Sequence, residues 1–235
     1  MLRTILLLLP LLPLLPLAAL PAAAQPQPVP DTLAQRALAC TGCHGKQGRA
    51  APDGYYPRLA GKPAGYLYNQ LLNFRDGRRD YGLMNELLAP LSDAYLQALA
   101  GHFASLDLPY PSPQTPTLPA PELARAEQLI RHGDPARRLP ACTACHGERL
   151  TGTQPGVPGL LGLSRDYLNG QLGAWRSGLR RAQAPDCMAQ IARTLTEPEI
   201  NAMTQYLAGQ PMPADPHPAA ALAAPAPVRC GGIAP

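Results

Sequence analysis

The chain has 235 residues, enough for two domains of about 100 residues each, and it is poor in aromatic (5%) and charged (15%) side chains. Its formal net charge of +4 is too small to indicate a protein that binds nucleic acid, so we expect no nucleic-acid partner.

Residues 1–24 have the pattern of a secretory signal peptide. Arg3 supplies a positive charge, an apolar run follows, and three alanines at 22–24 form a small-residue cleavage site. Four prolines interrupt the apolar run, which argues against a stable membrane-spanning helix, although an uncleaved anchor remains an alternative. We therefore expect a periplasmic protein whose mature chain begins near Gln25 with a Pro-rich spacer, residues 25–30.

The motif C-x-x-C-H occurs twice, and it is the attachment motif of c-type haem. The two copies consist of Cys40, Cys43 and His44, and of Cys142, Cys145 and His146. Two thiols three positions apart lie on the same side of a helical turn, so both reach the vinyl groups of one porphyrin, while the adjacent imidazole faces the iron. A redox C-x-x-C pair and half of a zinc site are the alternatives. We interpret the two copies as attachment sites for two covalently bound haem c groups.

The chain also repeats itself with an offset of 101 residues. The offset relates Pro57 to Pro158 and Tyr66 to Tyr167, and further matched positions follow each pair. A constant offset over many positions indicates a tandem duplication. We expect a first domain at 31–108, a Pro-rich linker at 109–121, a second domain at 122–212 and an Ala/Pro-rich tail at 213–235.

Apolar periodicity and capping residues predict a similar set of helices in each copy. The expected helices are a short one at 31–39 with Asp31 as N-cap, amphipathic ones at 66–75 and 167–176, one at about 122–130, and capped ones at 93–105 and 197–208. Ser92 and Thr196 are the N-caps of the last two, and Thr196 forms a capping box with Glu199.

A haem that only carries electrons needs a second axial ligand on its iron. A thioether suits this task because it favours ferrous iron. Met84 is the only methionine of the first mature copy, and Met188 holds the matching place in a loop of the second. Core filling is the alternative role for a methionine. A loop carbonyl near Pro57 or Pro158 could accept the Nδ1–H of the haem histidine and fix its ring, although either residue could be an ordinary turn proline.

Basic side chains follow the two amphipathic helices. They could neutralise haem propionates or form a solvated basic face. These residues are Arg75, Arg78, Arg176 and Arg180.

Two cysteines remain after haem attachment, Cys187 and Cys230. An exported protein rarely keeps two free thiols, so we predict a disulfide that pins the tail beside Met188 and holds the methionine loop. Two independent thiols, with Cys187 buried or on iron, are the alternative.

Taken together, C-x-x-C-H, P-x-L-x-G, Y-L-x-x-Q-L and a methionine before a capped helix all occur twice, and they resemble the dihaem cytochromes c of the c4 type over residues 31–210. The resemblance implies two all-α class I cytochrome c domains related by a pseudo-twofold axis, with their haem propionate edges facing each other. It implies His44 and Met84 as ligands of haem one, and His146 and Met188 as ligands of haem two.

The resemblance also implies an electron carrier, not an enzyme, which serves redox partners such as a respiratory complex, a dehydrogenase or a terminal oxidase. It allows a loose association with the membrane. The alternative is an oxidoreductase similar to dihaem thiosulfate dehydrogenases, with Cys187 as an axial thiolate. A peroxidase is a third option, but it would need an open site on one iron.

Overall fold

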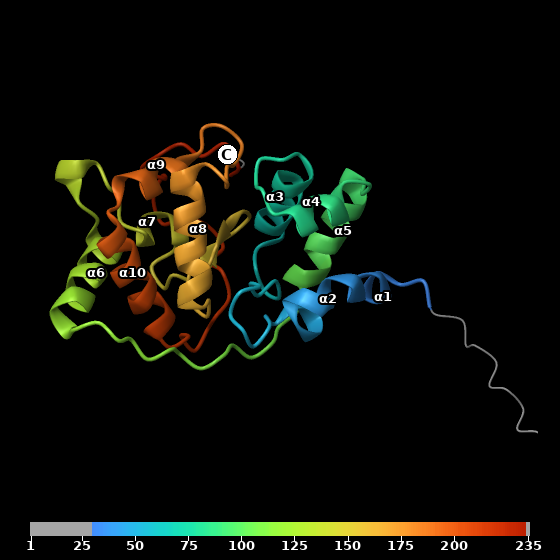
Figure 1. Cartoon of the computed structure of the whole chain (residues 1–235), viewed down its shortest axis with the longest axis horizontal. Coiled ribbons are helices and arrows are strands. Elements are labelled where there is room, and N and C mark those ends of the chain that lie inside the picture. Colours follow the sequence, from blue (N-terminus) through green and yellow to red (C-terminus); the bar gives the residue numbers. More distant parts are fainter. Residues whose placement is uncertain (1–29, 234–235) are drawn as a thin grey trace, which may run out of the picture. The chain divides into compact units, whose positions relative to one another are not determined.

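The computed structural model describes residues 30–233, so the predicted signal peptide and nearly all of the spacer lie outside the described residues. Two groups of helices follow each other along the chain (Figure 1). We call them lobe one, residues 31–108, and lobe two, residues 120–212, and we call residues 213–233 the tail. None of the helices in the described range is both long and apolar enough to cross a membrane.

Lobe one contains five α-helices and lobe two contains another five, and in each lobe a long loop follows the helix that carries the C-x-x-C-H motif. In lobe one these are α1 (Leu33–Arg36), α2 (Leu38–His44), α3 (Ala64–Arg75), α4 (Gly82–Leu88) and α5 (Asp93–Ala104). In lobe two they are α6 (Ala120–His132), α7 (Thr143–His146), α8 (Arg165–Ser177), α9 (Cys187–Thr194) and α10 (Glu197–Gly209). Two strands of two residues each, β1 (Gly152–Thr153) and β2 (Val157–Pro158), form a small antiparallel hairpin. The fold is all-α, as predicted.

Two of the three predicted N-cap residues, Ser92 and Thr196, cap their helices, and Asp31 does not. Ser92 accepts a hydrogen bond from the backbone N–H of Tyr95 (3.3 Å), and Thr196 forms the expected capping box with Glu199. At the first helix the N-cap is Thr32, not Asp31. The Asp31 carboxylate binds the Arg36 guanidinium instead (2.6 Å), because it lies one residue too early to reach the helix N–H groups.

Each lobe has its own apolar core. In lobe one α3 packs against α5, whose predicted inner residues Leu96, Leu99 and Phe103 are all buried. In lobe two α10 packs against α6 and α8 around a continuous cluster that includes the fully buried Ile130. Met203 and Met212 belong to this second core, in agreement with a core-filling role.

The Pro-rich linker is extended: Arg58 of lobe one binds its start, and lobe two binds its second half. The backbone N–H of Gln114 donates to the Ala208 carbonyl (2.9 Å), and that of Thr117 donates to the Gln205 side chain (2.8 Å). Helix α6 begins at Ala120, two residues before the predicted boundary, because Pro121 is well tolerated in the first helical turn.

The two lobes meet along chain segments that are equivalent in the repeat. Arg79 and Arg180 form an antiparallel backbone bridge, flanked by hydrogen bonds from Asp80 N–H to the Leu179 carbonyl (2.8 Å) and from Arg181 N–H to the Arg78 carbonyl (2.7 Å). The chain from Asp31 onwards accordingly forms one unit. A contact between equivalent residues is what a pseudo-twofold axis between tandem domains requires.

Candidate haem sites

Both C-x-x-C-H motifs lie where a helix can present their side chains together. Helix α2 carries Cys40, Cys43 and His44, and α7 carries Cys145 and His146 with Cys142 at its N-cap. All four cysteine thiols are free in the structure. Burial raises the pKa of Cys142 to about 12, so this thiol stays protonated and forms no anionic site of its own.

The two motif histidines are buried and held in the same way. The Nδ1 atom of His44 lies 2.9 Å from the Pro57 carbonyl oxygen, and that of His146 lies 2.7 Å from the Pro158 carbonyl oxygen. A carbonyl oxygen only accepts, so Nδ1 carries the proton and Nε2 keeps a free lone pair. Burial lowers the pKa of both imidazoles, which keeps them neutral near pH 7. Each ring is therefore prepared as a metal ligand.

The two candidate axial methionines occupy short helices, whereas a loop was expected for Met188. Met84 lies in the first turn of α4 and packs against a cluster of Phe74, Leu88 and Leu96. Met188 is the second residue of α9 and is half-buried. The backbone is more restricted in the first turn of a helix than in a loop. The direction in which each methionine side chain points is therefore better defined.

A polar cluster with two buried arginines joins the lobes, and its members are related by the 101-residue offset. It contains Tyr66, Gln70 and Arg79 of lobe one and Tyr167, Gln171 and Arg180 of lobe two. Each glutamine oxygen accepts hydrogen bonds from both guanidinium groups, at 2.6–3.0 Å. Among the described residues, no Asp or Glu forms an ion pair with either arginine. Two buried cations thus face each other with only neutral partners.

A buried donor without a partner lies beside this cluster. Trp175 Nε1 is buried and has no hydrogen-bond acceptor among the described residues, and the Arg180 guanidinium lies 3.7 Å from the centre of the Trp175 ring. The equivalent pair in lobe one is Arg79 over Phe74, at 4.3 Å. Buried N–H groups and unpaired guanidinium groups favour carboxylate acceptors, and each haem carries two propionate carboxylates.

The structure separates the four arginines that were predicted to neutralise haem propionates. Of the four residues proposed from the sequence, Arg180 alone lies in the cluster, whereas Arg75 and Arg78 bind Asp76 and Arg176 lies 3.8 Å from Glu197. The sequence analysis missed Arg79. Its pairing with Arg180 at the repeat offset was the available signal.

Comparison with known proteins agrees with this geometry. No family model matches the chain. It is 36% identical over 193 residues to cytochrome c4 of Thiocapsa roseopersicina, covering 80% of this chain and 96% of the relative. The chain belongs to the cytochrome c4 family.

Other similar proteins are a further cytochrome c4 and two proteins whose names refer to thiosulfate dehydrogenase. The chain is 37% identical over 177 residues to the thiosulfate dehydrogenase electron acceptor of Thiomonas intermedia, covering 75% of this chain and 80% of that protein. It matches reduced cytochrome c4 from Pseudomonas stutzeri with a TM-score of 0.65 and 30% identity, over 75% of this chain and 96% of the solved chain. It matches thiosulfate dehydrogenase TsdBA from Marichromatium purpuratum with a TM-score of 0.65 and 32% identity, over 73% of this chain but only 36% of that chain.

Membership of the cytochrome c4 family makes the protein a dihaem c-type cytochrome and an electron carrier with two covalently bound haems. The residues present fit that cofactor. Each lobe has two free thiols, one Nδ1-protonated histidine and one methionine candidate. Buried donors without carboxylate partners among the described residues lie where the lobes meet.

The two remaining cysteines form a disulfide in this cytochrome. Cys187 at the start of α9 is bonded to Cys230 of the tail, with Cα atoms 5.1 Å apart. A cysteine in a disulfide has no thiolate to give to an iron. The feature that supported a thiosulfate dehydrogenase-like enzyme, an axial Cys187 thiolate, is therefore missing from this structure.

Proposed function

We propose that the protein accepts single electrons from a thiosulfate dehydrogenase in the periplasm and passes them to a respiratory acceptor such as a terminal oxidase. The observation that supports this proposal is its similarity to a protein named as the electron acceptor of thiosulfate dehydrogenase. The similarity to TsdBA also supports the proposal. This chain matches 36% of a solved chain that is named as a thiosulfate dehydrogenase.

In this proposal His44 and Met84 hold the iron of haem one, and His146 and Met188 hold that of haem two. The bound haems supply reversible one-electron exchange. The Pro57 and Pro158 carbonyls fix the rings of the two histidines and raise the basicity of their Nε2 atoms. Met84 and Met188 would complete the two ligand sets, which would leave no position on either iron for a substrate.

The cluster at the lobe contact has a separate task in the same proposal. Arg79, Arg180 and the Trp175 N–H group would neutralise and bind haem carboxylates. Burying a carboxylate without such partners is costly, so these groups would lower the cost of placing haem carboxylates here.

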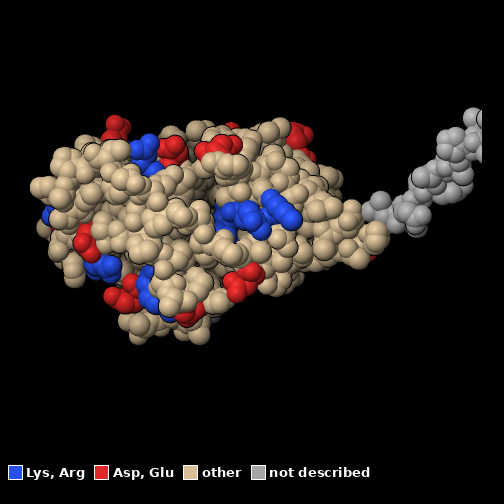
Figure 2. Space-filling view, turned by 90° about the horizontal axis from the view of Figure 1, so that it is seen from below, with Lys and Arg blue, Asp and Glu red and all other residues tan. Residues whose placement is uncertain are grey.

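The visible surface has no large patch of one charge, so we expect a partner that docks without strong long-range electrostatic attraction. Figure 2 shows a largely uncharged face on which basic and acidic side chains are interspersed. Several large apolar side chains are exposed near the proposed haem-one ligands: Leu38 beside the first motif, and Leu83 and Leu87 beside Met84. Exposed apolar side chains of this kind are typical of transient electron-transfer contacts.

The test is reduction of the ferric protein by thiosulfate with and without a purified thiosulfate dehydrogenase, followed in the haem absorption bands. We expect rapid reduction of both haems with the enzyme and none over the same time with thiosulfate alone. A monohaem cytochrome c serves as the control acceptor. Reduction no faster than that of the control would contradict the proposed partner, and rapid reduction without enzyme would support the enzyme alternative.

A further inference from the structure

The two methionine helices begin in different ways. In lobe one the residue after Met84 anchors the helix: Asn85 Oδ1 accepts from the Tyr81 backbone N–H (2.7 Å), and Asn85 Nδ2 donates to the carbonyls of Arg79 (3.1 Å) and Phe74. A single side chain thus ties the first turn of α4 to the end of α3 and to the loop that follows α3.

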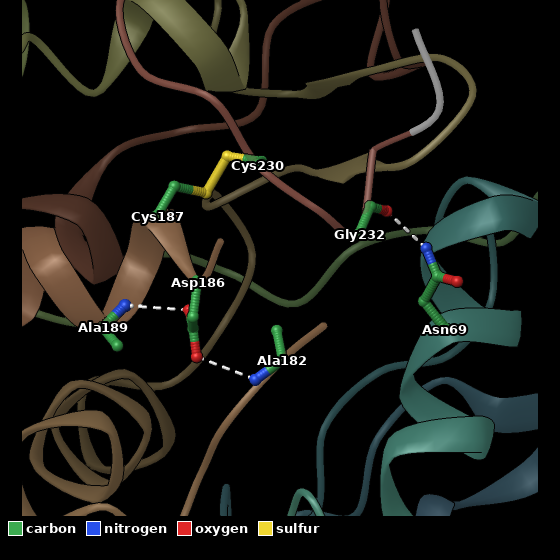
Figure 3. Close-up of a disulfide and its surroundings, with 7 residues drawn as sticks. All are labelled: Asn69, Ala182, Asp186, Cys187, Ala189, Cys230 and Gly232. Atoms are coloured by element: carbon green, nitrogen blue, oxygen red, sulfur yellow. Dashed lines mark hydrogen bonds between the residues drawn. A yellow bond between two sulfur atoms is a disulfide. The ribbon is translucent and has the colours of Figure 1, made fainter. Parts of the chain in front are cut away.

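Lobe two lacks this anchor. The residue after Met188 is Ala189, which is buried and has no polar side chain. Here Asp186 caps α9: its carboxylate accepts from the backbone N–H groups of Ala189 (3.0 Å) and Ala182 (2.7 Å), as Figure 3 shows. Both donors belong to the same stretch of chain, so these bonds shape the turn but do not fix it to another part of the molecule.

Helix α9 packs against α8 and the lobe-two core, and its first residue, Cys187, adds a covalent connection to the tail. Its disulfide to Cys230 joins the start of α9 to the tail, and the backbone N–H of the next tail residue, Gly231, donates to the Pro185 carbonyl (2.9 Å). Gly231 lies so close to the Ala184 carbonyl that a Cβ atom would overlap it. The tail therefore lies flat against the segment that leads into α9.

The same tail segment also reaches lobe one. Asn69 of α3 donates a hydrogen bond from Nδ2 to the carbonyl of Gly232 (Figure 3). The repeat-equivalent of Asn69 is Gly170, which has no side chain to make such a bond. The repeat therefore provides no equivalent bond from α8 of lobe two, and this contact breaks the symmetry between the lobes. We call the group formed by Asn69, Cys187 and residues 230–232 the clasp.

We propose that the clasp positions Met188 on the iron of haem two, in the role that Asn85 has for Met84. This inference rests on the proposed ligand set. A thioether is a weak ligand that binds only where the protein holds it, and Cys187 is bonded directly to Met188 in the chain. Cys187, Cys230 and Asn69 are thus positioning residues, and the clasp makes haem two dependent on an α3 side chain of lobe one.

The test compares C187S/C230S with N85A in the haem-loaded ferric protein. The readouts are the shifted methyl resonances of iron-bound methionine, imidazole binding and the two reduction potentials. Spectra of Met84→Ala and Met188→Ala assign each resonance to its lobe. We expect C187S/C230S to weaken or abolish the Met188 resonance, to raise imidazole affinity at least tenfold at haem two and to lower the potential of that haem. We expect N85A to do the same at haem one alone.

A second variant covers the case in which the double variant folds poorly. N69A keeps the disulfide and removes only the bond to Gly232, and we expect it to raise imidazole affinity at haem two by a smaller factor. The inference is overturned if C187S/C230S leaves the Met188 resonance and both potentials unchanged, or if it disturbs both haems equally. If Met188→Ala leaves every resonance in place, the ligand assignment itself fails, and that outcome is distinct from a failure of the clasp.

Discussion

Lys62 is a buried cation with one described partner, and its replacement makes a sharp test of how lobe one contacts lobe two. Its side chain is 5% exposed, and Nζ donates to the Gly159 carbonyl (2.8 Å), next to the Pro158 carbonyl that holds His146. Burial, with a smaller contribution from Arg58, lowers the pKa of Lys62 from 10.5 to about 7. The charged form is thus disfavoured in the folded protein.

The pKa shift of Lys62 sets the expected change in the free energy of unfolding. A pKa change from 10.5 to about 7 corresponds to about 5 kcal/mol of lost stability, at about 1.4 kcal/mol per unit. Lys62→Met removes this penalty and loses a hydrogen bond worth about 1 kcal/mol. We therefore expect the variant to gain about 3 to 4 kcal/mol in the free energy of unfolding at pH 7.

The pH dependence gives a second signature. The unfolded chain holds more protons on Lys62 than the folded chain does between pH 7 and 10.5, so wild-type stability rises with pH in this window. The penalty is fully present below pH 7 and disappears towards pH 10.5. The advantage of Lys62→Met should therefore shrink by about 1.4 kcal/mol per pH unit above pH 7.

The assay is denaturant unfolding at pH 7, 8 and 9, followed by circular dichroism and haem absorbance. The control is Leu163→Met, because Leu163 holds the repeat-equivalent position, and a volume-conserving change there should cost less than about 1.5 kcal/mol. The reasoning is refuted if Lys62→Met loses stability at pH 7. That result would mean that the ammonium has an anionic partner in the haem-loaded protein, for which a haem carboxylate is the natural candidate.

Three further predictions concern the ion pairs, the core and the ligands. The bidentate Arg137 contact lowers the pKa of Glu199 to about 2, so Glu199→Gln should lose up to about 1 kcal/mol at pH 6, and the difference should fade in unfolding curves as the pH drops from 4.5 towards 2. Ile130→Ala should cost about 3 kcal/mol of lobe-two stability in denaturant unfolding, because Ile130 is fully buried in that core. Met84→Ala and Met188→Ala should each lower one reduction potential and open one iron to imidazole, while a spectrum unchanged by either variant would contradict that ligand.

The repeat and the local chemistry made much of the fold predictable. The C-x-x-C-H motifs, the 101-residue offset and the caps at Ser92 and Thr196 depend on neighbours in sequence, and the structure confirms the helices that they predicted. The disulfide was predictable by counting cysteines. Asp31 shows the limit of such local reasoning, because a shift of one residue decides whether a carboxylate caps a helix or pairs with an arginine.

The contacts between lobes could not be predicted in this way. A sequence shows that Arg79 and Lys62 are basic, but their burial depends on which surface of the second lobe covers them. The same holds for Trp175, because the sequence does not show that its N–H group is buried without an acceptor among residues 30–233. Tertiary burial decides these roles, and no periodicity along the chain reports it.

The contact between Arg79 and Arg180 has a consequence for the origin of the molecule. Each arginine binds the glutamine of its own lobe and that of the other, so the surface is complementary to a copy of itself. One lobe alone carries a complete half of this surface in Tyr66, Gln70 and Arg79. Two identical lobes could close on each other around a true twofold axis, and a single-domain ancestor could have formed the same pair as a homodimer before duplication joined the halves. The two halves now differ at the contact, since the repeat equivalents of Asn69 and Lys62 are Gly170 and Leu163.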